Sequence, residues 1–206
     1  MVLSVSCLTV SRAGRAVLSD LSFDLMAGQA LRVQGRNGVG KTTLLRCLAG
    51  LQPALAGRIE IAADSLAYAG HADGVKLPLT VLENLRFWAD IFGTQTITDS
   101  LRLFGLEALQ TRLAGSLSAG QKRRLGLSRL WLAKRRVWLL DEPTVSLDQQ
   151  AVGQFAAMVG AHLQAGGAAV IATHIDLGLD ARAQILDLAQ FKAKGAALER
   201  ADEACL

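Results

Sequence analysis

The chain has 206 residues, of which 51% are hydrophobic, and its 22 basic and 18 acidic residues give a formal net charge of +4. This length and apolar content suit one compact α/β domain over residues 1–206. The charge excess is too small to indicate a nucleic-acid partner, and an aromatic fraction of 5% offers little surface for stacked bases. We therefore expect no nucleic acid among the partners.

The N-terminal third predicts strands and one helix. The first residues, MVLSVSCLTV, lack the basic start and long apolar run of a signal peptide and alternate as a half-buried strand does. LSFDLMAGQALRVQG predicts a strand, a turn at 27–28 and a second strand at 31–33. A helix is expected from Lys41 to about Leu51, and GRIEIAADSLAYAG indicates two more strands.

The middle of the chain predicts helices. In LTVLENLRFWADIFG, Thr80 and Glu83 form a T-x-x-E capping box at a helix start. A short helix is expected at 100–104, and a longer one from LSAGQ to about Ala133.

The last third predicts buried strands. VWLL (137–140) and AAVIATH (168–174) are typical of strands buried on both faces of a parallel sheet. Residues 149–175 carry no charged side chain, but their glutamines and paired glycines are too polar for a bilayer helix, so they predict a helix, a turn and a strand. Any membrane association is therefore expected to come through a partner.

The segment GRNGVGKTT matches the phosphate-binding pattern G-x-x-x-x-G-K-[ST] and stands between a predicted strand and a predicted helix. Its glycines permit backbone conformations in which successive N–H groups point toward phosphates. Lys41 would reach the β- and γ-phosphates, and Thr42 would bind Mg²⁺. The expected nucleotide-binding residues are Gly35, Arg36, Asn37, Gly38, Val39, Gly40, Lys41, Thr42 and Thr43.

Three further side chains are expected at the same edge of the sheet. Asp141 and Glu142 follow the strand VWLL, and His174 ends AAVIATH. In a doubly wound sheet the carboxyl ends of the strands face the phosphate loop. Asp141 would then hold Mg²⁺, Glu142 would act as the general base on water, and His174 would contact the γ-phosphate.

LSAGQ predicts a second anion-binding helix start. Ser118 and Gln121 form an S-x-x-Q capping box, and Gly120 exposes backbone beside them. Because one phosphate loop already serves one nucleotide, a second such device suggests a nucleotide held by another copy in a two-fold pair. The residues of this helix start are Leu117, Ser118, Ala119, Gly120 and Gln121.

Nearly the whole chain resembles the ATP-binding subunits of ATP-binding cassette (ABC) transporters. The resemblance rests on five motifs that stand in the order and spacing of that family, namely GRNGVGKTT, LSAGQ, VWLLDEP, SLD and ATH. The resemblance implies a P-loop NTPase (RecA-like) α/β core, an N-terminal antiparallel β subdomain and a helical subdomain at about 71–130. It also implies ATP and Mg²⁺ as ligands, a homodimer of ATPase subunits, and integral membrane subunits as partners. By the same resemblance, LSAGQ would face the partner's ATP through Ser118, Gly120 and Gln121, and Asp148 of SLD would link the two sites across the dimer.

Two positions depart from the family pattern. The family often stacks an aromatic residue on adenine, whereas TVSRAGRAVL has none and places Arg12 there, which leaves an arginine stack or looser base recognition open. Nine residues before Thr80 stands His71, where the family usually has the glutamine that senses the γ-phosphate, Mg²⁺ and the membrane partner.

Two longer stretches resemble the haem-exporter ATPases of bacterial cytochrome c maturation. They are AYAGHADGVKLPLTVLENLRFWADIFG and LSAGQKRRLGLSRLWL. This implies a peripheral subunit on the cytoplasmic face of the inner membrane that drives haem export or release of a haem-loaded chaperone.

The alternatives are an ATPase of another exporter, for lipid or small molecules, a soluble cassette ATPase, and a regulatory module without turnover. The single cassette speaks against the second alternative. The intact residues Lys41, Asp141, Glu142 and His174 speak against the third.

Overall fold

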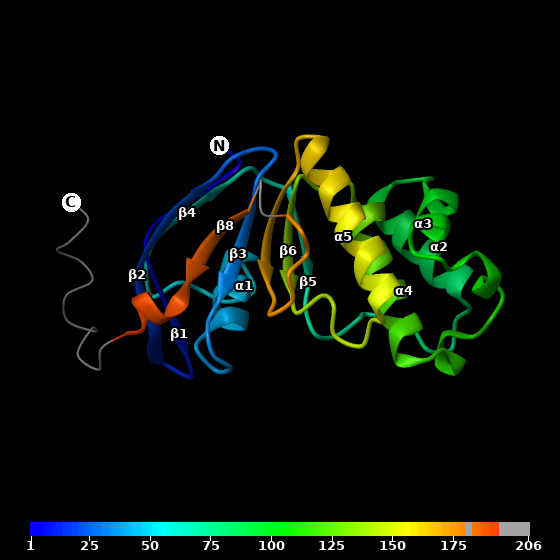
Figure 1. Cartoon of the computed structure of the whole chain (residues 1–206), viewed down its shortest axis with the longest axis horizontal. Coiled ribbons are helices and arrows are strands. Elements are labelled where there is room, and N and C mark those ends of the chain that lie inside the picture. The colour runs from blue at the N-terminus through cyan, green and yellow to red at the C-terminus, as the bar shows by residue number, and fades with distance from the viewer. Residues whose placement is uncertain (180–182, 194–206) are drawn as a thin grey trace.

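The computed structural model describes residues 1–179 and 183–193, and it arranges two sheets and a group of helices along the longest axis (Figure 1). An antiparallel sheet of order β2-β1-β4 contains β1 (Leu3–Arg12), β2 (Arg15–Leu25) and β4 (Ala56–Ile61). A parallel sheet of order β5-β6-β7-β3-β8 contains β3 (Ala30–Gln34), β5 (Leu66–Ala69), β6 (Val137–Asp141), β7 (Ala168–Ala172) and β8 (Ala183–Asp187).

The described helices are α1 (Lys41–Leu48), α2 (Val81–Phe92), α3 (Ile97–Leu103), α4 (Ala119–Ala133) and α5 (Gln149–Gln164), with short 3₁₀ turns η1 (Glu107–Leu109), η2 (Ala114–Ser116) and η4 (Leu188–Phe191). Within residues 1–179 and 183–193, none of them has the length and apolar character needed to cross a bilayer.

The parallel sheet separates two hydrophobic cores. On β6, Val137 and Leu139 pack into the core shared with α1 and the antiparallel sheet, whereas Trp138 and Leu140 pack into the core shared with α2, α3, α4 and α5. This alternation follows from the period of two along a strand. It explains why VWLL is apolar at every position.

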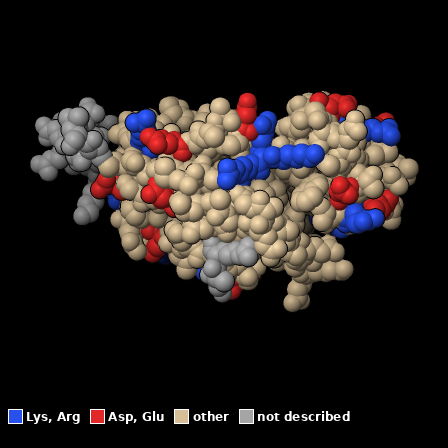
Figure 2. Space-filling model, turned by 90° about the horizontal axis from the view of Figure 1, so that it is seen from above, with Lys and Arg blue, Asp and Glu red and all other residues tan. Residues whose placement is uncertain are grey.

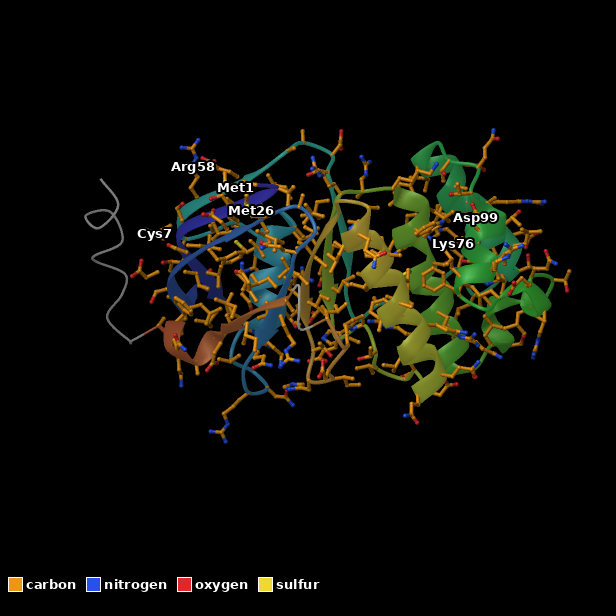
Figure 3. All side chains as sticks on the ribbon, turned by 45° about the horizontal axis from the view of Figure 1, so that its top comes forward. Met1, Cys7, Met26, Arg58, Lys76 and Asp99 are labelled. Atoms are coloured by element: carbon orange, nitrogen blue, oxygen red, sulfur yellow. The ribbon has the colours of Figure 1, made fainter. Side chains whose placement is uncertain are left out.

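Charged side chains occur at both ends of the molecule. Lys76 and Asp99 mark the helical end, and Arg58 and Met26 lie near the antiparallel sheet (Figure 3). On the face seen in Figure 2, acidic and basic side chains are interspersed, and a row of Lys and Arg crosses the middle. This mixed surface agrees with the small net charge of +4.

The predicted capping boxes are confirmed. Thr80 Oγ1 accepts a bond from Glu83 N at 3.2 Å, and Glu83 Oε2 accepts one from Thr80 N at 2.7 Å, so α2 begins at Val81. The predicted ends of two helices were wrong. Helix α1 ends at Leu48 rather than at about Leu51, and α3 begins at Ile97 rather than at Ser100. Strand β8 was not predicted.

Candidate functional site

A cavity of about 760 Å³ opens where β3, β6 and β7 end. These strands are parallel, so their carboxyl ends meet at one edge of the sheet. The cavity wall brings together residues that the sequence predicted from four separate segments, namely Asn37, Gly38, Gly40, Lys41, Thr42, Thr43, His71, Asp141, Glu142 and His174.

The loop from Gly35 to Gly40 needs its glycines. The backbone φ angles of Gly35, Gly38 and Gly40 are 143°, 81° and 120°, which lie in the region that L side chains rarely adopt. Helix α1 begins directly afterwards, at Lys41, and the N–H groups of its first turn have no partner within the helix. The loop and helix start therefore form a site suited to phosphate oxygens.

Other members of the predicted loop contribute differently. Val39 is half-buried and packs against the core beside the antiparallel sheet, and its N–H donates to the Arg36 carbonyl at 3.1 Å. Arg36 is exposed. The described residues that line the cavity do not include Gly35, Arg36 or Val39.

Lys41 lies at the centre of a group of charged and polar side chains. Its Nζ donates to the Gly35 carbonyl at 3.0 Å and lies 2.8 Å from His174 Nε2 and 3.6 Å from Glu142 Oε1. The lysine side chain is only 9% exposed, so these neighbours replace much of its hydration. His174 Nε2 also lies 3.5 Å from Glu142 Oε1 and 3.3 Å from Asn37 Oδ1.

Asp141 is fully buried, and neither of its carboxylate oxygens has a hydrogen-bond partner among the described residues. His71 Nε2 lies 3.6 Å from Asp141 Oδ2. An unpaired buried carboxylate is costly, so its position calls for a cation. Asp141 and Thr42 line the same cavity and offer the oxygen ligands that Mg²⁺ prefers, and these residues therefore fit a divalent cation.

Glu142 stands just beyond β6 with a φ of 46°, an uncommon conformation for a residue other than glycine. Its backbone N–H donates to the Ala172 carbonyl of β7 at 2.8 Å. This bond holds the residue at the sheet edge, and strained backbone of this kind often occurs at functional sites.

The segment LSAGQ, Leu117 to Gln121, which we call the signature, lies elsewhere. Ser118 Oγ accepts from Gln121 N at 3.2 Å, and Gln121 Oε1 accepts from Ser118 N at 2.9 Å, as the capping box predicts. Asp148 Oδ1 caps α5 by accepting from Ala151 N at 2.8 Å. Neither the segment from Leu117 to Gln121 nor Asp148 is among the described residues that line the nucleotide cavity.

Several residues of the site carry no clear sequence signal. Arg46 and Gln52 line the cavity beside Arg12, and Gln52 Nε2 donates to the Ser11 carbonyl at 2.7 Å. Arg123 is 5% exposed, and its Nη2 donates to the Glu142 carbonyl at 2.9 Å. Arg123 stands within a basic run, KRR, which is typical of a solvated helix face and gives no sign of burial.

Comparison with known proteins agrees with this geometry. The family described as ABC transporter matches residues 18–145, which is more than half of the chain. The chain is 61% identical over 193 residues to the cytochrome c biogenesis ATP-binding export protein CcmA of Rhodobacter capsulatus, covering 94% of this chain and 90% of that protein. It is 59% identical to the protein of the same name from Roseobacter denitrificans, covering 100% of both.

The fold is similar to a solved ATP-binding subunit of an ABC transporter. The TM-score is 0.82 at 25% identity, and the match covers 95% of this chain and 90% of that one.

Proposed function

Because the chain belongs to the ABC transporter family of ATP-binding proteins, we propose that it is the ATP-hydrolysing subunit of a membrane complex that serves cytochrome c maturation. The observation that carries the proposal is the convergence of Lys41, Glu142 and His174 beside the phosphate loop. The relatives named for cytochrome c biogenesis supply the physiological role.

The placement of these three side chains supports a mechanism for hydrolysis. Water attacks the γ-phosphorus as the bond to the β-phosphate oxygen breaks, and Glu142 accepts the proton that the water loses. Lys41 and His174 stabilise the charge on the transferred group. Positioning and electrostatic stabilisation are the main contributions a protein makes to phosphoryl transfer.

Asp141 and Thr42 would hold the Mg²⁺ that accompanies ATP. The bound cation would neutralise charge on the phosphate oxygens. His71 lies at the edge of this site, 3.6 Å from Asp141, and it would contact the same group of oxygens from the side of the β5–α2 connection.

Two copies of the chain would complete each site. Ser118, Gly120 and Gln121 form a capped helix start that lies outside the nucleotide cavity of their own chain, and a phosphate of the partner's nucleotide suits such a helix start. A head-to-tail homodimer satisfies both chains at once. Asp148, beyond the Glu142 loop, would stand near the two-fold axis and link the sites.

The physiological assembly would lie on the cytoplasmic face of the bacterial inner membrane. Integral membrane subunits would hold the chain there and use its ATP cycle to export haem or to release a haem-loaded periplasmic chaperone. Haem is thus the cargo of the complex, and the chain itself would contact nucleotide, its own second copy and the membrane subunits.

A chromosomal Glu142→Gln replacement tests this role. A haem-stained gel of membranes and periplasm should lose covalently attached haem, while the optical spectra of non-covalent b-type haem persist. Glu107→Gln, which changes an exposed carboxylate in η1, is the matched control and should leave the stained bands intact. Unchanged c-type cytochromes in the Glu142→Gln strain would contradict the cytochrome c role.

Phosphate release by the purified chain tests the chemistry separately. Removal of a positioned general base typically lowers the rate by about 10² to 10⁴-fold. Equal turnover by wild type and Glu142→Gln would show that another group activates the water.

A further inference from the structure

The side chain of Arg123 forms hydrogen bonds between α4, the helix that begins at the signature, and the backbone at the carboxyl end of β6. It lies in α4, two residues beyond Gln121, and is 5% exposed. Its Nε donates to the Pro143 carbonyl at 3.0 Å, and its Nη2 donates to the carbonyls of Glu142 at 2.9 Å and Asp141 at 3.4 Å. The guanidinium therefore binds the backbone that carries the predicted Mg²⁺ ligand Asp141 and the predicted general base Glu142.

The other edge of the same guanidinium binds the segment that carries His71. Arg123 Nη1 donates to the Gly70 carbonyl at 2.9 Å and to Asp73 Oδ1 at 2.8 Å. Close packing reinforces the contact, because a Cβ at Gly126 would lie 2.6 Å from Asp73 Cβ. The segment 70–73 thus lies directly against α4.

The start of α4 also contacts the loop after Glu142. A Cβ at Gly120, within the signature, would lie 2.7 Å from the Ser146 carbonyl oxygen. A helix with contacts this close on two sides cannot shift without moving the segments it touches. The planar fork of arginine fixes the relative positions of the groups it binds, which a lysine cannot do with one ammonium group.

We propose that Arg123 is a positioning residue that couples the signature at the start of α4 to Glu142 and His71 in the nucleotide cavity of the same chain. The proposal rests on the proposed function, because it requires the signature to meet the partner's nucleotide. A phosphate that binds at Ser118 fixes α4, and Arg123 transmits that fixed position to the carbonyl of Glu142. Binding of the partner's nucleotide at Ser118 therefore positions Glu142 of the same chain for hydrolysis of its own nucleotide.

The first test compares Arg123→Met with Arg124→Met in the full chain. Arg124 is a matched control, because its Nη1 also donates to two carbonyls, those of Phe104 at 3.0 Å and Gly105 at 3.2 Å. Both carbonyls lie directly after α3 and not at the nucleotide cavity. We expect Arg123→Met to lower kcat by about 10- to 100-fold, as loss of a supporting contact to a metal ligand does. The KM for ATP should stay within about 2-fold, because the phosphate loop is unchanged.

The decisive test is a double-mutant cycle with Ser118→Ala. If Arg123 carries the effect of the signature, the Ser118→Ala/Arg123→Met chain is no slower than the slower single variant. The cycle of Ser118→Ala with Arg124→Met should give multiplied effects. If the losses of kcat in Ser118→Ala and Arg123→Met also multiply in the double variant, the coupling is overturned and Arg123 has only a structural role.

A conservative variant covers the case in which Arg123→Met fails to fold. Asp73→Asn keeps the arginine and removes only the charge of its carboxylate partner, whose side chain is 26% exposed. The same non-additivity with Ser118→Ala is expected, with a smaller loss of kcat. Additive behaviour of Asp73→Asn would overturn the proposal.

Failure of the proposed function gives a different pattern. A wild-type chain without ATP turnover, or a Ser118→Ala chain as fast as wild type, overturns the dimeric ATPase and the coupling together. Normal turnover with a clear Ser118→Ala defect, combined with multiplied effects at Arg123, overturns the coupling alone.

Discussion

Asp141→Asn should stabilise the chain in the absence of nucleotide and metal while it weakens the response to Mg–ATP. The carboxylate is fully buried, and neither oxygen has a hydrogen-bond partner among the described residues. Among the described residues, the nearest basic group is His71 Nε2 at 3.6 Å, on a side chain that is 63% exposed. Such a charge costs several kcal/mol to bury. An unpaired neutral amide of the same shape costs about 1–3 kcal/mol.

The difference leaves a gain of about 1–3 kcal/mol for the variant. For a chain of this length, each kcal/mol raises Tm by about 2–4 °C, so the expected increase is about 2–12 °C. Thermal unfolding in EDTA measures it directly. The same scan with Mg–ATP should show a large upward shift for wild type and a small one for the variant, because ligand binding stabilises only the state that binds.

The exposed Asp99→Asn is the control for loss of one negative charge, and its effect should stay within about 0.5 kcal/mol. An Asp141→Asn chain that melts at or below the wild-type temperature in EDTA would refute the reasoning. In that case solvent or a neighbouring group already satisfies the carboxylate, and its burial is not a cost that the cation offsets.

Three other predictions follow from local contacts. Thr80→Ala removes the cap of α2 and should lower the unfolding free energy by about 0.5–2 kcal/mol in urea titrations, whereas an unchanged midpoint would show that the helix end does not depend on the cap. Burial lowers the pKa of His162, which stacks on Trp138 at 3.7 Å between ring centroids. Its neutral ring therefore contributes stability that is complete above the unfolded pKa of about 6.5 and is lost as pH falls through the lower folded pKa. His162→Phe should flatten this part of the stability profile, and an equally steep loss in the variant would assign the pH dependence to other groups. Gly40→Ala forces an alanine to a φ of 120° and should weaken binding of a fluorescent ATP analogue at least about 10-fold, and unchanged affinity would show that the loop can relax.

The sequence predicted those parts of the site that depend on local chemistry. Lys41, Asp141 and His174 each stand at a strand end or helix start whose pattern is visible within a few residues, and parallel strands bring their carboxyl ends to one edge. The capping box at Ser118 was equally local. These predictions needed no knowledge of long-range packing.

Other features depend on contacts between distant segments. The burial of Arg123 follows from the carbonyls of Gly70 and Glu142, which lie far away in the chain. Strand β8 is a short edge strand, AQILD, which includes the polar residues Gln184 and Asp187, so it lacks the continuous apolar run that marks VWLL. Neither could be predicted from a short window of sequence.

The capping box of the signature has a consequence for assembly. In the single chain, Ser118 Oγ already accepts from Gln121 N, and Gln121 Oε1 already accepts from Ser118 N. In the proposed homodimer, a phosphate that arrives with the partner chain would exchange some of these bonds rather than add new ones, so the net gain per contact would be modest. In that dimer two nucleotides would act together at one interface, so association should depend steeply on ATP concentration. The chain would then respond to the energy state of the cell as a threshold, with few dimers at low ATP and many once both sites fill.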